Sequence, residues 1–219
     1  MQRLRLRFGR GEEVKFISHL DIMRFWERAF RRAGMPLAYS QGFTPHPRIS
    51  LAAPLAVGVT SEAELMDVWL NRWMPPQSFV MSAKQQLPPG FTIFEAWQVG
   101  LNMPSLQSCL GFAEYHIVME IKQTKQEVES SLHSLLQAEE LPWHHSRGSK
   151  LHFYDLRRLI DDLWLIDYHD SCYILGMRLH CDASGSGRPE QVTAALGFPQ
   201  YPKSIHRTRL ILKTGESGA

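Results

Sequence analysis

The sequence is poor in cysteine and has no long apolar run. Its 219 residues include three widely spaced cysteines, Cys109, Cys172 and Cys181. That spacing fits neither a disulfide framework nor a cysteine-rich zinc or iron–sulfur site, so we expect reduced thiols in a cytoplasmic protein. There is no stretch of about 18 uncharged apolar residues, and the N-terminus lacks the apolar segment of a signal peptide, so we expect no membrane partner.

The chain also lacks a large excess of either charge, since 24 Lys and Arg stand against 22 Asp and Glu. The charges are unevenly distributed: ten basic residues against four acidic ones over residues 1–50, ten against seventeen over 51–200, and four against one over 201–219. Basic ends around an acidic middle indicate an anionic partner such as RNA, although a pI near 8.5 is below that of a dedicated nucleic-acid binder.

The apolar pattern of the first hundred residues predicts the order β-α-β-β-α-β. Residues 3–8 alternate arginine with an apolar residue, which predicts a strand with one apolar and one cationic face. Ser18 fits the N-cap of a helix that ends at Gly34. Other extended segments are predicted at 37–40, 48–53, 63–70 and 91–99, and a second helix at 77–86.

The second half repeats this order loosely. It has predicted strands at 113–121, 150–153, 163–168, 173–180 and 204–213, and predicted helices at 125–138 and 188–196. We therefore expect an α+β fold of tandem ferredoxin-like (split β-α-β) domains with antiparallel sheets, one over residues 1–102 and one over 105–219.

Arginines gather on the first strand, on the first helix and in two loops. Sheet faces of this topology bind single-stranded RNA, and helix positions i, i+4 and i+7 share one face. A merely solvated surface explains the same pattern, because no stacking aromatic residues are interleaved with the first-strand arginines. The candidate RNA-binding residues are Arg3, Arg5, Arg7, Arg24, Arg28, Arg31, Arg48 and Arg188.

Ten histidines show neither paired i, i+4 spacing nor a Cys-x-x-Cys neighbour, so we expect no metal and no cofactor. His19, beside Asp21 in the first turn of the predicted helix, is a candidate general base, as is His46 in a proline-fixed loop. A polar residue at a helix start explains His19 equally well. The glycine-rich segment 185–189 before a helix suits an anion but lacks the Lys-Ser/Thr of a P-loop.

Several segments together resemble the radical-SAM-linked protein family, a bacterial family of unknown function. The match is specific at Phe16–Asp21, Arg31–Arg48, Leu55–Gly58 and Ser61–Glu64, and weaker at 155–157 and 187–189. Thr44 stands where asparagine would be expected. We expect the segments around His19 and His46 to meet as one surface patch. The motif residues proposed for it are Ser18, His19, Asp21, Tyr39, Ser40, Gly42, Phe43, Pro45, His46 and Glu64.

The resemblance implies a partner more than an activity. Members of that family are fused to, or encoded beside, a radical-SAM protein with a cobalamin-binding-like domain. This chain has no Cys-x-x-x-Cys-x-x-Cys, so it would be an accessory protein that binds RNA or a ribosomal particle and is not an enzyme on its own. Two alternatives stay open. The tandem architecture is also similar to CRISPR repeat-processing endoribonucleases, in which His19 or His46 would act without metal. A purely protein-binding adaptor is the other.

Overall fold

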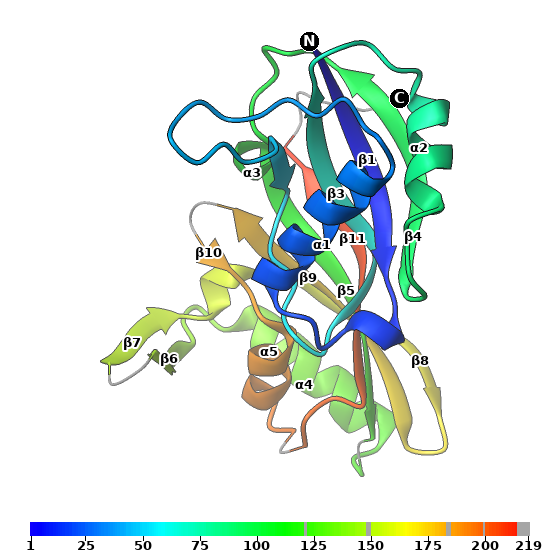
Figure 1. The fold of residues 1–219 in the computed structure, drawn as a ribbon. Coiled ribbons are helices and arrows are strands. Elements are labelled where there is room, and N and C mark those ends of the chain that lie inside the picture. Colours follow the sequence, from blue (N-terminus) through cyan, green and yellow to red (C-terminus); the bar gives the residue numbers. More distant parts are fainter. Residues whose placement is uncertain (121, 148–149, 183–184, 199, 214–219) are drawn as a thin grey trace. The chain divides into compact units, whose positions relative to one another are not determined.

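The computed structural model describes residues 1–120, 122–147, 150–182, 185–198 and 200–213 (Figure 1). The fold is α+β with antiparallel strand pairing, as predicted. Its contacts divide the chain into two compact units, Met1–Leu110 and Gly111–Ala219, called unit 1 and unit 2 below. Among the described residues, none of the helices is long and apolar enough to cross a membrane.

Unit 1 has the strand order β4-β1-β3-β2, and each neighbouring pair is antiparallel. With one helix after the first strand and one after the third, this is the ferredoxin-like arrangement. The predicted strand at 37–40 is reduced to isolated bridges. The elements are β1 (Gln2–Arg10), η1 (Glu12–Val14), α1 (His19–Arg32), β2 (Ile49–Leu51), β3 (Thr60–Leu70), α2 (Pro76–Lys84), β4 (Phe91–Val99) and α3 (Leu106–Cys109).

The core of unit 1 lies between α1 and one face of the sheet. The alternation in β1 directs Leu4, Leu6 and Phe8 into it, and all three are buried. The rings of Phe8 and Trp26 meet edge to face with centroids 5.0 Å apart. The apolar stripe of α1 is therefore buried, and its arginine-bearing face remains at the surface.

Unit 2 has the corresponding order β11-β5-β9-β8, with an additional hairpin, β6–β7, between its first helix and β8. The β5–β9 and β8–β9 pairs are antiparallel. The elements are β5 (Leu110–Glu120), α4 (Lys125–Gln137), β6 (Pro142–Arg147), β7 (Lys150–Asp155), η2 (Arg157–Leu159), β8 (Ile160–His169), β9 (Cys172–Asp182), β10 (Gly185–Ser186), α5 (Pro189–Ala195) and β11 (Ser204–Leu212).

Candidate nucleic-acid interface

The arginines of β1 do not form the exposed row expected from the sequence. Arg3 donates to Oδ2 of Asp67 from Nε (3.0 Å) and Nη2 (2.5 Å), and Arg5 Nε lies 2.9 Å from Oδ1 of the same carboxylate. All three side chains are buried. Arg3 also donates to the carbonyl oxygens of Met103 and Pro104, so the segment after β4 covers this part of the sheet. Buried charges need such partners, which removes Arg3 and Arg5 as phosphate ligands.

Arg7 is the partly exposed member of the same row. Its Nε lies 2.7 Å from Oε1 of Glu95, and its guanidinium lies 4.7 Å from the ring centroid of Phe94. Both charged side chains are about half exposed, so this pair contributes little to stability. Arg7 is thus accessible but already partly neutralised by an acidic neighbour.

The outer face of α1 carries the expected basic residues at the surface. Arg24, Arg28 and Arg31 are all exposed. Arg24 Nη1 lies 3.4 Å from Oδ1 of Asp21, a weak exposed pair, and Arg31 Nε donates to the carbonyl oxygen of Glu27 at 3.3 Å. These contacts leave most of each guanidinium in solvent. The helix therefore presents a cationic stripe along its length.

A loop over residues 39–48, the 39–48 loop, follows α1 and is fixed at its base. The backbone amide of Arg48 donates to the carbonyl of Ala38, and the amide of Trp69 donates to the carbonyl of Arg48 (2.8 and 3.0 Å). The guanidinium of Arg48 also lies 4.9 Å from the Trp69 ring centroid. Beyond this base, Phe43 is fully exposed and Tyr39 is 41% exposed. The loop therefore displays two aromatic rings, and an exposed arginine stands at its base.

His19 and His46 are held by different elements of unit 1, and their meeting in one patch stays a prediction. The 39–48 loop is fixed at Trp69, which pairs with Arg3 near the start of β1. His19 lines a pocket with Arg10, the last residue of β1. His19 begins α1, and Figure 1 shows the 39–48 loop leaving the opposite, C-terminal end of that helix.

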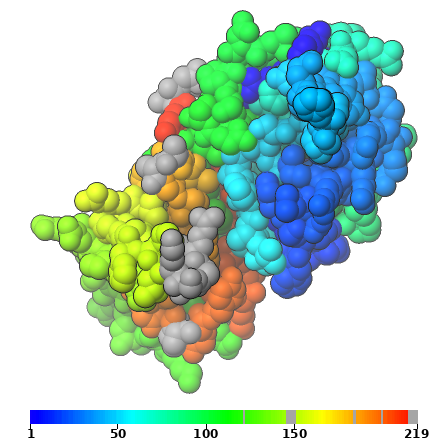
Figure 2. Space-filling view, turned by 60° about the vertical axis from the view of Figure 1, so that its left-hand side comes forward, coloured from blue at the N-terminus to red at the C-terminus, as the bar shows by residue number. Residues whose placement is uncertain are grey.

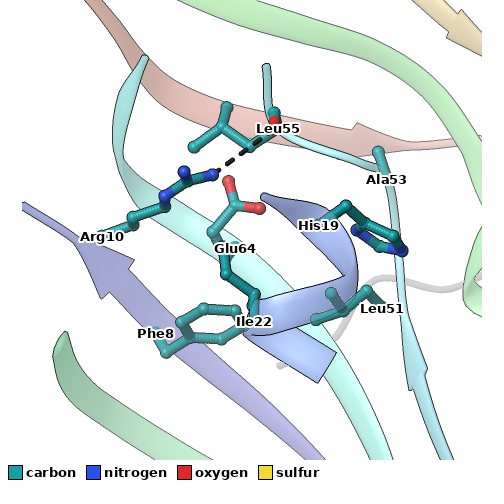
Figure 3. A pocket seen from close by; sticks show the side chains of 8 residues that line it. All are labelled: Phe8, Arg10, His19, Ile22, Leu51, Ala53, Leu55 and Glu64. Atoms are coloured by element: carbon teal, nitrogen blue, oxygen red, sulfur yellow. Dashed lines mark hydrogen bonds between the residues drawn. The ribbon is translucent and has the colours of Figure 1, made fainter. Parts of the chain in front are cut away.

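The pocket beside His19 is small, and the buried Arg10 is one of the residues that line it (Figure 3). Its volume, about 10 Å³ counted as space for the centre of a water molecule, accommodates roughly one water. Arg10 donates to the carbonyl oxygens of Val14, Lys15 and Ile17 at 3.1, 2.8 and 2.6 Å. Arg10 thereby fixes the chain that leads to Ser18, whose Oγ caps α1 by accepting from the amide of Asp21. The pocket is lined by Phe8, Arg10, His19, Ile22, Leu51, Ala53, Leu55 and Glu64.

The glycine-rich segment at 185–189, whose sequence suits an anion, takes part in strand pairing and close packing. Gly185 and Ser186 form β10, and the amide of Gly187 donates to the carbonyl of His180 at 2.9 Å. A Cβ at residue 187 would lie 2.8 Å from the carbonyl oxygen of Leu159, so close packing accounts for this glycine. Among the described residues, no group of three or more His, Cys, Asp or Glu side chains is placed to hold a metal ion.

Comparison with protein families gives a match over residues 3–189 to the family described as "Uncharacterized protein conserved in bacteria (DUF2344)". The chain belongs to the DUF2344 family. Comparison with curated protein sequences gives no match.

The fold of this DUF2344 protein is similar to chains in two solved structures. One is "Crystal Structure of a Cbf5-Nop10-Gar1 Complex" (8% identity, TM-score 0.52), and the other is "Structure of H/ACA RNP bound to a substrate RNA containing 2'-deoxyuridine" (7% identity, TM-score 0.50). The alignments cover 94% of this chain but only 48% and 47% of those chains, so it spans about half their length. At such identities the likeness concerns the fold alone.

Sequence reasoning missed two residues that position arginines of the DUF2344 protein. Trp69 was not selected, although it contacts Arg48 and supports the 39–48 loop. Asp67, an acid between the apolar Met66 and Val68, was the available signal that the first-strand arginines are paired. Arg188 is exposed, as a ligand-binding residue would have to be.

Proposed function

We propose that this protein is an accessory recognition protein that binds RNA or a ribosomal particle through unit 1. The observation that carries the proposal is the joint exposure of the α1 arginines and the aromatic rings of the 39–48 loop. Figure 2 shows the blue residues of α1 and the lighter blue loop on one face of unit 1. We name this surface, Arg24, Arg28, Arg31, Tyr39, Phe43 and Arg48, the α1–loop surface.

This combination meets a physical requirement that the β1 arginines do not meet. Sequence-tolerant binding of single strands uses cations for the phosphates and aromatic faces for the bases. The fully exposed ring of Phe43 supplies a stacking face, while Arg24, Arg28 and Arg31 supply positive charge. The occurrence of a similar fold in a particle bound to a substrate RNA supports the same ligand class.

The second part of the proposal is that the protein works with a radical-SAM partner. Its support is the resemblance carried by Phe16–Asp21 and Arg31–Arg48, together with the lack of a Cys-x-x-x-Cys-x-x-Cys sequence in this chain. The partner would perform the chemistry, and this protein would bring the substrate to it. Affinity purification of the tagged full chain, followed by mass spectrometry, tests this part independently of RNA.

RNA binding is tested by measuring affinity for a labelled single-stranded RNA against salt concentration. Each phosphate contact on a single strand contributes a log–log slope of about −0.7. Replacing Arg24, Arg28 and Arg31 by Gln is therefore expected to flatten the slope by about 2. The matched control replaces three exposed cations elsewhere, Arg72, Lys84 and Lys125, and leaves the slope unchanged.

The stacking part has its own variant. Phe43→Ala is expected to weaken binding by about fivefold or more, because stacking of a base on an aromatic ring is worth about 1–3 kcal/mol. Affinity that is insensitive to salt, or no binding at low salt, contradicts the proposed function. Protein partners without RNA would instead support the adaptor alternative.

A further inference from the structure

The β6–β7 hairpin forms a sheet of its own in unit 2. Its two strands pair in antiparallel register from Pro142 opposite Asp155 to Arg147 opposite Lys150. In Figure 1 the hairpin projects away from β8, β9 and the two helices of unit 2. A two-stranded ribbon has little core of its own, which is why it is only marginally stable by itself. Apolar side chains on such a ribbon therefore tend to stay exposed. Leu151 and Phe153 are accordingly 56% and 77% exposed.

The sequence of the hairpin has a charge opposite to that of its surroundings. Residues 142–155 contain one acid, Asp155 at the base, against one arginine, one lysine and three histidines. The stretch 51–200 around them has seventeen acidic residues against ten basic ones. A solvated ribbon needs only polar residues of either sign, so an excess of basic residues within an acidic part of the chain favours an anionic ligand.

The described side chains of the hairpin offer a stacking face. The imidazole of His144 and the ring of Phe153 lie on paired positions of the two strands, with ring centroids 5.7 Å apart. Both residues are exposed. Rings held side by side on a ribbon suit the flat face of a nucleobase, which stacks without regard to its identity.

The base of the hairpin is fixed next to another cation. The hydroxyl of Tyr154 donates to Oε1 of Gln191 in α5 at 2.6 Å. Burial raises the pKa of Tyr154, and the positive charge of Arg188 opposes that rise. The backbone amide of the same Gln191 donates to the carbonyl oxygen of Arg188 at 3.0 Å, so Arg188 stands at the start of the helix that anchors the hairpin, and its side chain is exposed.

We infer that the β6–β7 hairpin and Arg188 form a second contact surface for single-stranded RNA, with a base stacked on Phe153 and His144 and a phosphate bound by Arg188. This surface is built from unit 2 and shares no residue with the α1–loop surface. It rests on the proposed function only for the class of ligand.

The experiment compares three full-length proteins in binding to the same labelled single-stranded RNA: wild type, Phe153→Ala/Arg188→Gln, and the α1 triple variant. We expect the Phe153→Ala/Arg188→Gln protein to bind at least about fivefold more weakly. The matched control is Ile166→Ala/Lys122→Gln, which removes an exposed apolar side chain and a charge from unit 2 and is expected to bind normally. Thermal melting checks that each variant folds. We expect all of them to fold, because the substituted side chains are exposed.

The outcomes separate this inference from the proposed function. Loss of affinity in the Phe153→Ala/Arg188→Gln protein with a normal α1 triple variant supports the hairpin and contradicts the α1–loop surface. A normal Phe153→Ala/Arg188→Gln protein overturns the hairpin inference while a weakened α1 triple variant upholds the proposed function. A Phe153→Ala/Arg188→Gln protein that loses a bound protein partner but keeps its RNA affinity also overturns the hairpin inference, because the hairpin would then be a protein-binding surface.

Discussion

Trp164 of β8 lies across Gly176 of β9, and its indole occupies the space that a side chain at residue 176 would need. The two residues are partners in the β8–β9 register. The nearest atoms to a Cβ at this position belong to the indole of Trp164, at distances that no real contact allows. Glycine is therefore required here by the close approach of a large ring and not by a turn.

Replacing Gly176 by Ala is expected to destabilise the protein by about 1–3 kcal/mol, because the added methyl group overpacks the β8–β9 pair. Urea unfolding of the full chain measures the change. Gly111→Ala is the matched control, since the nearest atom to its Cβ is 3.4 Å away on the flexible side chain of Lys213. Adding Trp164→Leu to Gly176→Ala is expected to restore part of the loss, and equal stability of the two glycine variants would contradict the packing argument.

The buried carboxylate of Asp67 gives a second prediction. Asp67→Ala leaves Arg3 and Arg5 without this partner in a buried site, so we expect a loss of about 3–5 kcal/mol in the free energy of unfolding. Glu95→Gln breaks the half-exposed pair with Arg7 and is expected to change stability by at most about 1 kcal/mol. Comparable losses of stability in the two variants would contradict the argument that burial makes the contacts of Asp67 more important than the exposed Arg7–Glu95 pair.

The start of α4 gives a prediction for pH. The amide of Thr124 donates to Oε2 of Glu127 at 2.7 Å, and the Thr124 hydroxyl donates to the same oxygen at 2.8 Å. These two bonds lower the pKa of Glu127 below 4.5. The stabilisation they provide is present above the ordinary carboxyl pKa and is lost as the pH falls through the lowered value.

Thr124→Val removes the hydroxyl bond and is expected to raise the pKa of Glu127 part of the way to its ordinary value. Thr124→Ser keeps a hydroxyl and is expected to preserve the low pKa. Titration of the Glu127 side-chain carboxyl followed by NMR measures both. A valine variant that titrates like the serine variant would show that the backbone bond alone sets the pKa.

The separation of His19 from His46 predicts the absence of ribonuclease activity. One phosphodiester needs a base and an acid within hydrogen-bond reach, and these histidines are held at opposite ends of α1, since His19 begins the helix and His46 lies in the loop after its C-terminal end. Purified protein is therefore expected to leave a hairpin RNA intact in EDTA. Metal-free cleavage that falls at least about a hundredfold in His19→Ala or His46→Ala would establish the endoribonuclease alternative instead.

Local signals were sufficient to predict α1. Ser18 and Gly34 were expected at its two ends, and the helix spans His19–Arg32 with Ser18 as its N-cap and Gly34 at a φ of 68°. The β-α-β-β-α-β order was likewise visible in the spacing of apolar segments. Capping and periodicity involve neighbours in sequence, which explains why these predictions held.

Long-range partners could not be predicted in the same way. The Arg3–Asp67 pair joins residues 64 positions apart, and the coverage of Arg3 depends on carbonyl groups about a hundred positions away. The strand β6 was missed because Trp-His-His-Ser has no alternation of apolar and polar residues. It pairs only with β7 in a separate two-stranded sheet, so no apolar face marks it.

The 39–48 loop and the β6–β7 hairpin occupy the same connection in the two units. The first joins α1 to β2, and the second lies between α4 and β8, which is the first helix and second strand of unit 2. Lengthening a connection of this kind leaves every ladder of the sheet unbroken, and doubling a loop costs only about 0.6 kcal/mol of closure entropy. Each extension is therefore a replaceable part, and grafting one onto the other unit would move the proposed RNA contacts while leaving the sheet and helices of both units unchanged.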